Sequence, residues 1–274
     1  MYIPLLKLTK HCAMKKFFLL IPLCLMLVSC GNQSGSKNKV KILAHRGLCS
    51  SGTEFVTDEN TLDALRRAQE AGVDGCEFDV HMTADGQLVI RHDAKIEGKL
   101  NCQKSTFDEI RAYRLPFGNQ IPTLHEWLEQ AKKTPEIPQM LEIKAHPTAE
   151  IEKEVVTKCL EEVRAMDMMD QVYFLSFKTE TCDEVLRQEP GAKVLLNSSS
   201  LHNSMPPKEV KEHGYAAISY NINVILNHTP WIKEFQDLGI ETFFWMVDDP
   251  YLRKIAEEWG FDWVTTDFYD VIKY

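Results

Sequence analysis

The chain has 274 residues, of which 44% are hydrophobic and 26% charged, and its formal net charge is −9. This composition excludes a disordered chain, and the length suits one large α/β domain. The first 29 residues hold four lysines and no acid, so removing those four positive charges leaves the rest of the chain at −13. So acidic a remainder argues against nucleic acid or an anionic membrane surface as a general partner.

The N-terminal residues have the pattern of a targeting segment. Met14-Lys15-Lys16 gives a basic start, and the apolar run from Phe17 to Val28 is too short to span a membrane as a helix. The sequence Leu27-Val28-Ser29-Cys30-Gly31 resembles a bacterial lipobox with Cys30 as the acylated residue. An ordinary secretory signal that happens to contain a cysteine is the alternative.

These features predict three segments. Residues 1–30 are expected to contain a signal peptide with the lipobox, and Met14 is expected to be the true start of translation. Residues 31–39 are expected to be a polar, flexible tether. Residues 40–274 are expected to form the folded domain. The predicted location is the bacterial cell envelope, on its periplasmic or surface side, with the membrane as a partner through a lipid on Cys30.

Cysteine usage gives no disulfide framework. Of the eight cysteines, Cys12, Cys24 and Cys30 belong to the N-terminal segment. The other five, an odd number spread along a long chain, do not form a disulfide framework. Cys49 and Cys102 could pair in an oxidising compartment, and free thiols are the alternative.

From Val40 onward, apolar strand patterns alternate with amphipathic helix patterns to the end of the chain. This alternation predicts a parallel sheet, and eight such units predict a closed (β/α)8 TIM barrel; an open, doubly wound sheet is the alternative. The eight expected strands are Val40–Ala44, Gly75–Val80, Gln139–Ile143, Gln171–Leu175, Lys193–Leu196, Ala216–Ser219, Glu241–Val247 and Asp262–Thr265.

Two segments depart from the alternation. Leu88–Ile90 is predicted to be the return arm of a hairpin and not a barrel strand. Ala94–Gln120 is predicted to be an insertion before the helix that begins near Pro122, with one short helix over Thr106–Tyr113. A long insertion at the catalytic end of a barrel usually shapes the substrate mouth.

The second expected strand and its hairpin carry the first candidate site. Glu77 and Asp79 lie two apart, so their carboxylates share one face of the strand. A tight turn at Thr83–Gly86 would bring His92 back opposite Glu77. Two hard oxygen ligands and an imidazole would then form a metal-assisted acid/base site. His81 shares the same face and competes with His92, although we expect it to orient its neighbours.

The C-terminal ends of barrel strands face the active site. Glu142 and Lys144 share a face of a later strand, and three carboxylates together could hold a divalent cation. The planar guanidinium of Arg46 can donate two parallel hydrogen bonds, and the ammonium of Lys144 is a compact positive charge. Both groups suit the binding of a phosphate. The strand ends carry, in chain order, His45-Arg46-Gly47, Glu77, Asp79, Glu142-Ile143-Lys144, Ser176-Phe177, Asn197, Asn221, Trp245 and Asp267.

An ordered series of motifs extends this pattern from Val40 to the C-terminus and resembles one family. The motifs are His45-Arg46-Gly47, Glu59-Asn60-Thr61-Leu62, Glu77-Phe78-Asp79-Val80 with Asp85-Gly86, His92-Asp93, Glu142-Ile143-Lys144 and Ser176-Phe177. Together they resemble the glycerophosphodiester phosphodiesterases, a barrel family related in fold to phosphoinositide-specific phospholipases C.

The resemblance implies an enzyme that hydrolyses glycerophosphodiesters to glycerol phosphate and an alcohol with the help of one divalent cation, Ca²⁺ or Mg²⁺. Two alternatives stay open: a phospholipase-type phosphodiesterase acting on lipid or lysolipid, and a binding lipoprotein without catalysis. The implied roles are His45 and His92 as the acid/base pair, Glu77, Asp79 and Glu142 as metal ligands, and Arg46 and Lys144 as phosphate contacts.

Other strand-end residues have open roles. Trp245, with Phe177, is either barrel packing or an apolar wall of the substrate pocket. Asp267 could hydrogen-bond a catalytic histidine or cap a loop. Asn60 is expected to cap or pin the first helix, and Glu59 to support a neighbour and not to bind metal. The remaining histidines are expected at the surface or at helix ends: His125, His146, His202, His213 and His228.

Overall fold

The computed structural model of the chain describes residues 39–98 and 100–274. The predicted signal peptide, the predicted acylation site Cys30 and the predicted tether up to residue 38 lie outside the described residues. Among the helices of the described ranges, none combines the length and the apolar character that a membrane crossing requires.

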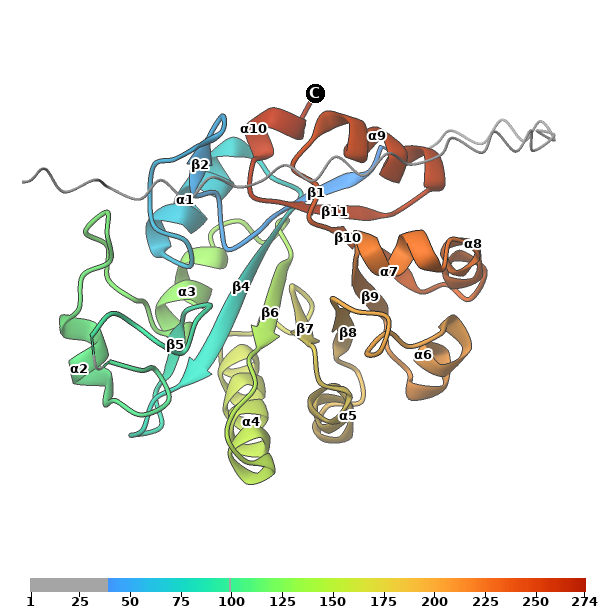
Figure 1. Cartoon of the computed structure of the whole chain (residues 1–274). Coiled ribbons are helices and arrows are strands. Elements are labelled where there is room, and N and C mark those ends of the chain that lie inside the picture. Colours follow the sequence, from blue (N-terminus) through green and yellow to red (C-terminus); the bar gives the residue numbers. More distant parts are fainter. Residues whose placement is uncertain (1–38, 99) are drawn as a thin grey trace, which may run out of the picture. The chain divides into compact units, whose positions relative to one another are not determined.

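Eight parallel strands close into a barrel with helices around it (Figure 1). The first strand, β1, pairs with both β11 and β4, so the sheet has no open end on that side and the predicted TIM barrel is confirmed. The open-sheet alternative is therefore wrong. The barrel strands are β1 (Lys41–Ala44), β4 (Gly75–Met82), β6 (Gln139–Ile143), β7 (Val172–Ser176), β8 (Lys193–Ser198), β9 (Ala217–Asn221), β10 (Glu241–Trp245) and β11 (Trp263–Thr266).

Helices follow the strands on the outside of the barrel, as the alternation predicts (Figure 1). A short two-stranded ribbon, β2 (Ser50–Ser51) and β3 (Glu54–Phe55), follows β1. The helices are α1 (Leu62–Ala71), α2 (Phe107–Ala112), α3 (Leu124–Ala131), α4 (Ala149–Ala165), α5 (Thr179–Gln188), α6 (Pro207–His213), α7 (Ile222–Asn227), α8 (Pro230–Asp237), α9 (Pro250–Trp259) and α10 (Tyr269–Ile272).

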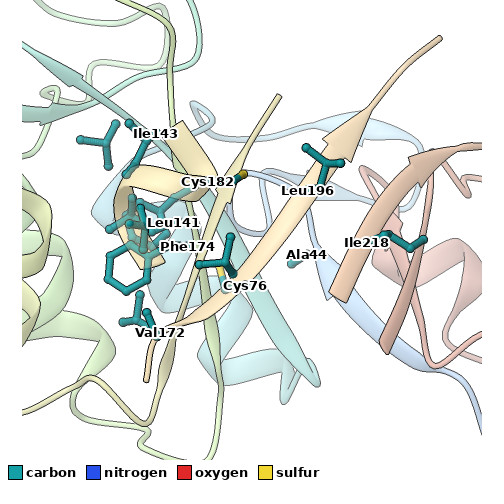
Figure 2. Packing of buried hydrophobic residues seen from close by; sticks show 14 of the residues in the cluster. Ala44, Cys76, Leu141, Ile143, Val172, Phe174, Cys182, Leu196 and Ile218 are labelled. Atoms are coloured by element: carbon teal, nitrogen blue, oxygen red, sulfur yellow. The ribbon is translucent and has the colours of Figure 1, made fainter. Parts of the chain in front are cut away.

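The strands are buried on both faces, which explains their nearly continuous apolar sequences. Their outward side chains pack under the helices; Figure 2 shows Leu141 of β6 beside Phe174 of β7, which are partners in the sheet register. The inward side chains below the mouth form a separate apolar layer inside the barrel: Leu43, Met140, Leu175, Leu195, Ala217, Phe243 and Trp263.

The predicted hairpin is formed by β4 and β5 (Leu88–Ile90), but its predicted register is wrong by one residue. The observed pairing puts Phe78, not Glu77, opposite the position of His92. The turn after Thr83 holds three residues where two were predicted, and Gly86 completes it with a φ of 85°. A three-residue turn with a left-handed last residue is a common hairpin connection, and its extra residue shifts the pairing.

The insertion before α3 has a small core of its own, built from six buried residues: Val89, Ile96, Cys102, Ile110, Leu115 and Ile121. Its predicted short helix is α2, which Thr106 and Glu109 begin with a reciprocal capping box. Cys49 and Cys102 are both buried and free, like the three other cysteines of the described residues. The alternative of free thiols therefore describes Cys49 and Cys102.

Candidate active site

The turn after β1 aims the first two motif residues at the barrel mouth. Arg46 has a φ of 57° and Gly47 a φ of 79°, which turns the chain sharply toward α1. A Cβ atom on Gly47 would lie 2.7 Å from the Cβ of Ala64 and 2.9 Å from its backbone carbon. Only glycine fits both the left-handed backbone and this close approach to the helix. The glycine of the His-Arg-Gly motif therefore fixes the position of the two residues before it.

His45 is held on both sides of its ring. Its Nδ1 lies 2.7 Å from Oδ1 of Asp267, and its Nε2 lies 3.9 Å from Oε2 of Glu77. Burial alone would lower its pKa, but the hydrogen bond to Asp267 and the charge of Glu77 outweigh burial and raise the pKa above 6.5. Asp267 was expected either to hydrogen-bond a catalytic histidine or to cap a loop, and in the structure it hydrogen-bonds His45.

Three carboxylates meet at the ends of β4 and β6. Glu77, Asp79 and Glu142 are 4%, 1% and 6% exposed, and ligand oxygens from all three lie within 4.8 Å of one another. The sheet register explains this convergence, because Asp79 and Glu142 are direct partners on adjacent parallel strands. Hard oxygen donors at this spacing suit Ca²⁺ or Mg²⁺, so the donor set fits the divalent cation that the family implies.

Burial opposes the ionisation of this cluster. Burial, with repulsion from Asp79, raises the pKa of Glu77 to about 8, and the same causes raise that of Glu142 to about 7. Burial opposes ionisation of Asp79 as well, but Lys144 lowers the pKa of that carboxyl below its usual value. Burial and mutual repulsion therefore favour the protonated forms of Glu77 and Glu142, and an added positive charge would favour their ionised forms.

Lys144 lies among these acids. Its Nζ is 3.1 Å from Oδ1 of Asp79 and 2.7 Å from Oε1 of Glu142, and the two carboxylates raise the pKa of the ammonium despite its burial. Lys144 is not among the residues that line the cavity. In this structure the predicted phosphate contact is thus paired with two of the predicted metal ligands.

Arg46 reaches the same cluster from β1. Its backbone N–H donates to Oε2 of Glu77 at 3.0 Å, and its Nη1 donates to Glu59 at 2.8 Å. Its Nε is buried without a hydrogen-bond partner and lies 3.7 Å from Asp79. Glu59 therefore supports Arg46, and the guanidinium retains a donor for an anionic group.

Asn60 does not cap the first helix, contrary to the prediction. Thr61 is the N-cap of α1, and Asn60 precedes it with a left-handed φ of 58°. This backbone turns the amide inward, where Nδ2 donates to Asp79 Oδ2 at 2.7 Å and Oδ1 accepts from the Asp79 backbone N–H at 3.1 Å. Asn60 thus fixes a metal-ligand candidate and not the helix.

His92 follows β5 and lines the cavity with its side chain partly exposed. Its Nδ1 lies 2.8 Å from Oδ1 of Asp93, and burial lowers its pKa below 6.5. His81 is buried outside the cavity lining, and its Nε2 lies 3.1 Å from the carbonyl oxygen of His92 while Gln103 bonds its other nitrogen at 3.0 Å. The expectation that His81 orients its neighbours agrees with these contacts.

Of the two predicted positions for His146, at the surface or at a helix end, the surface position is wrong: His146 is buried and lies two residues before the N-cap of α4. Its Nε2 accepts from the backbone N–H of Met82 at 3.1 Å, and its Nδ1 lies 2.7 Å from the carbonyl oxygen of Lys144. The buried position comes from the chain turning inward after β6, where Glu152 of α4 accepts the His146 backbone N–H. No spacing rule in the sequence distinguishes this histidine from the exposed ones.

A cavity of ≈ 320 Å³ opens at the C-terminal end of the barrel. Trp245 and Phe177 both line it, with their rings edge to face at 6.1 Å, so they form an apolar wall and not only barrel packing. The indole Nε1 of Trp245 donates to Oδ1 of Asn197 and to the carbonyl oxygen of Ser219, both at 2.9 Å. Of the predicted charged residues, the cavity is lined by His45, Arg46, Glu77, His92, Glu142 and Asp267.

The sequence model of the glycerophosphoryl diester phosphodiesterase family matches residues 45–271, which include every charged residue of this site. The chain belongs to this family. It is therefore an enzyme of the phosphodiester hydrolase class. A curated glycerophosphodiester phosphodiesterase from Caldanaerobacter subterraneus is 26% identical over 84% of this chain and 94% of its own length.

Solved structures of the family share the fold. A glycerophosphodiester phosphodiesterase from Parabacteroides distasonis is 34% identical, with a TM-score of 0.77 over 84% of this chain and 93% of that one. A phosphodiesterase from Oleispira antarctica, solved with its product sn-glycerol-3-phosphate, has a TM-score of 0.75 over 85% of this chain and 95% of that one. It is 21% identical, so that likeness supports the family barrel alone.

Several residues of this family site carry no motif signal. Asp248 accepts from the hydroxyl of Thr266 at 2.9 Å and from the backbone N–H of Asp267 at 2.8 Å, and so fixes the partner of His45. Ser219 and Thr265 line the cavity without belonging to any motif. Because side chains alternate between the two faces of a strand, the sequences of β9 and β11 could have predicted that Ser219 and Thr265 point into the barrel.

Proposed function

We propose that the chain hydrolyses water-soluble glycerophosphodiesters to glycerol phosphate and an alcohol. The observation that carries this proposal is the buried triad of Glu77, Asp79 and Glu142 beside two imidazoles at one cavity. The Oleispira protein of the same fold, solved with sn-glycerol-3-phosphate, supports a glycerol phosphate product.

Glu77, Asp79 and Glu142 would hold one Ca²⁺ or Mg²⁺ ion through their carboxylate oxygens. When bound there, the cation supplies positive charge against the phosphoryl oxygens. The raised pKa values of Glu77 and Glu142 support this assignment, because a cation is the positive charge that would ionise both groups.

His45 and His92 are the proposed acid/base pair. Asp267 holds the Nδ1 side of His45 at 2.7 Å, which leaves Nε2 facing Glu77 and the cavity. His45 would protonate the leaving oxygen, since Asp267 favours its charged form. His92 would accept the proton of the nucleophile, since burial favours its neutral form.

Arg46 and Lys144 are the proposed phosphate contacts. Arg46 lines the cavity, and the Nε of its guanidinium is buried without a hydrogen-bond partner among the described residues. Lys144 would contact phosphate once a cation takes over its present partners Asp79 and Glu142. Both side chains would then stabilise negative charge that develops on the equatorial oxygens.

The test uses metal-stripped protein with glycerophosphocholine and glycerophosphoethanolamine, with and without Ca²⁺ or Mg²⁺. The proposal expects release of glycerol phosphate that depends on added metal and stops with chelator. Release of glycerol with phosphocholine would assign the other ester bond. Tight binding without turnover in metal-loaded protein would instead favour the binding lipoprotein.

A second candidate function is hydrolysis of lysolipid headgroups. It is favoured by exposed apolar side chains on segments that follow barrel strands, including Phe55, Phe117 and Phe177. Lysophosphatidylcholine micelles and glycerophosphocholine, assayed side by side, separate the two candidates. A rate higher for the micelles would make lysolipid the substrate.

We also propose attachment to the cell envelope through a lipid on Cys30, on the strength of the lipobox-like sequence. Cys30→Ser should move the protein from the membrane fraction to the soluble fraction. Retention of this variant in membranes would refute the anchor.

A further inference from the structure

Two buried histidines lie behind the charged wall of the cavity, which is formed by the charged lining residues around β1, β4, β5 and β6 and by Asp267. His81 belongs to β4 and is 3% exposed, and His146 follows β6 and is 7% exposed. Their rings lie edge to face at 5.7 Å, and neither residue lines the cavity. The proposed chemistry uses neither ring, so the pairing of these two buried polar side chains has to be explained in another way.

The side chain of Gln103 connects these histidines to the insertion before α3. Its Nε2 lies 2.7 Å from the carbonyl oxygen of Ala145 and 3.0 Å from Nδ1 of His81. A carbonyl oxygen can only accept a hydrogen bond, so the group of Gln103 that faces Ala145 is the amide nitrogen. The same nitrogen donates its second hydrogen to His81, whose Nδ1 is therefore the ring nitrogen without hydrogen.

The partners of both rings determine which nitrogen carries the hydrogen. Nε2 of His81 lies 3.1 Å from the carbonyl oxygen of His92, so Nε2 is the donor of that ring. Nε2 of His146 accepts from the backbone N–H of Met82 at 3.1 Å, so its hydrogen is on Nδ1, which lies 2.7 Å from the carbonyl oxygen of Lys144. Both imidazoles are therefore neutral, with opposite tautomers, and all their ring nitrogens have partners inside the protein.

The two carbonyl groups that accept from these rings belong to residues with proposed roles in the reaction. His92 is the proposed base, and Lys144 is a proposed phosphate contact. The strand pairing of β4 with β5 ends at Ile90, so the carbonyl of His92 lies beyond the strand and accepts its hydrogen bond from His81. The backbone of Lys144 is held from both sides, because its N–H donates to the carbonyl of Val80 at 3.2 Å.

We propose that His81, Gln103 and His146 are positioning residues, which together hold His92 and Lys144 at the spacing that turnover requires. This inference rests on the proposed function for the roles of His92 and Lys144. The insertion takes part in the arrangement because it contributes Gln103. A displacement of a reacting group by about 1 Å can lower a rate by about 10²-fold, so hydrogen bonds behind the cavity can control kcat.

Two substitutions of His81 separate positioning from packing. The amide nitrogen of a glutamine side chain reaches the place of Nε2 in a histidine, whereas that of asparagine reaches only the place of Nδ1. His81→Gln can therefore keep the hydrogen bond to the carbonyl of His92, and His81→Asn loses it.

A second pair of variants tests the insertion. Gln103→Ala removes the hydrogen bonds to Ala145 and His81 from a half-buried side chain. Gln120→Ala is the matched control, because Gln120 is another half-buried amide of the insertion and donates to the carbonyl oxygen of Arg111 at 3.1 Å. Urea denaturation of both variants compares their unfolding free energies.

The full chain is assayed with glycerophosphocholine and saturating Ca²⁺ or Mg²⁺, and kcat and KM are measured separately. We expect kcat to fall by about 10²-fold in His81→Asn and by about tenfold in Gln103→Ala, with little change in KM, because the groups that bind the substrate remain. His81→Gln should recover most of the loss. Gln120→Ala should have the kcat of the wild type and a stability close to that of Gln103→Ala.

Two results would overturn the proposal. If His81→Gln is as slow as His81→Asn, the hydrogen bond to His92 does not control the rate and the ring only supports the fold. A wild-type kcat in folded Gln103→Ala would exclude a positioning role for the insertion.

If the wild type hydrolyses no glycerophosphodiester, the proposed function fails, and NMR of histidine rings labelled at nitrogen then tests the arrangement alone. Hydrogen on Nε2 of His81 and on Nδ1 of His146, with a His92 signal that shifts in Gln103→Ala, would support it. The opposite tautomer at either buried ring, or a His92 signal that does not respond to Gln103→Ala, would refute it.

Discussion

The two walls of the cavity are built by different rules. On the charged wall almost every functional group is held by another: Asp267 and Glu77 flank His45, while Asn60 and Lys144 hold Asp79. On the uncharged wall, which the cavity residues of β7 to β10 form, apolar side chains surround the Nδ2 of Asn197 and the hydroxyl of Ser219, and neither group has a hydrogen-bond partner within residues 39–98 and 100–274. This difference indicates that contacts within the protein hold the charged wall in place, whereas the uncharged wall keeps polar atoms free to bind a ligand.

Removing an imidazole from the charged wall should have the largest effect on turnover. We expect His45→Ala and His92→Ala each to lower kcat by about 10³-fold, the usual contribution of a positioned acid or base. The fold and metal binding should persist, because neither ring packs in the barrel core. Steady-state kinetics, with metal binding measured by calorimetry, check this expectation.

The matched control is His125→Ala, an exposed histidine on α3 that contacts Glu162. Its kcat should equal that of the wild type. A near-normal rate in either cavity variant would remove that histidine from the acid/base pair and shift attention to His81.

Cation affinity should rise steeply with pH. Without metal, the pKa values of Glu77 and Glu142 are about 8 and about 7, so both carboxyls hold protons at pH 6 and release them toward pH 8. Each released proton contributes up to about tenfold in affinity per pH unit. Calorimetric titration of Ca²⁺ or Mg²⁺ at several pH values measures this slope.

Glu77→Gln removes one of these titrations and should flatten the pH dependence as well as weaken binding. The same raised pKa values lower the stability of the metal-free protein as pH rises from about 5 to 8, since only the unfolded chain ionises freely there. A pH-independent affinity would mean that both carboxyls are already ionised in the free protein.

Removing the hydrogen bond between Asp267 and His45 should lower activity less than removing an imidazole does. Asp267→Asn removes the carboxylate that raises the pKa of His45, so this pKa should fall. If His45 is the acid, the alkaline limb of the kcat/KM profile moves to lower pH, and activity at neutral pH drops by about tenfold. A shift of the acid limb alone would exchange the roles of His45 and His92.

Substitutions in the turn after β1 should change stability, with the smallest effect expected at Gly52. Gly47 and Gly52 both have left-handed backbones, but a Cβ meets Ala64 at 2.7 Å only at Gly47 and nothing within 4 Å at Gly52. Gly52→Ala should cost about 1 kcal/mol of unfolding free energy, and Gly47→Ala about 1–2 kcal/mol more. The difference between the unfolding free energies of the two variants, measured by urea denaturation, gives the cost of the steric clash with Ala64. Equal costs would show that the turn is free to move away from α1.

The charged wall was predictable from the sequence because charges at buried strand ends are costly and stand out against apolar runs. His45, Glu77, Asp79 and Glu142 were recognised in this way, together with the barrel strands. The hairpin register was missed because one additional turn residue displaces every pair.

The uncharged wall left no such signal. Ser219 and Thr265 are common residues in strands; alternation along each strand gives their inward direction, but only the closed barrel shows that they share one cavity. The roles of Asn60 and His146 were missed for a related reason, because their partners Asp79 and Met82 are distant along the chain and close only in the fold.

The most direct test of the division between the two walls is a crystal structure with glycerol 3-phosphate and Ca²⁺. Our account predicts Ca²⁺ on the oxygens of Glu77, Asp79 and Glu142, with the phosphate beside Arg46. The glycerol hydroxyls should lie within hydrogen-bonding distance of the uncharged wall, at Asn197 or Ser219. A glycerol moiety directed to solvent, or hydrogen-bonded only to charged residues, would contradict the account.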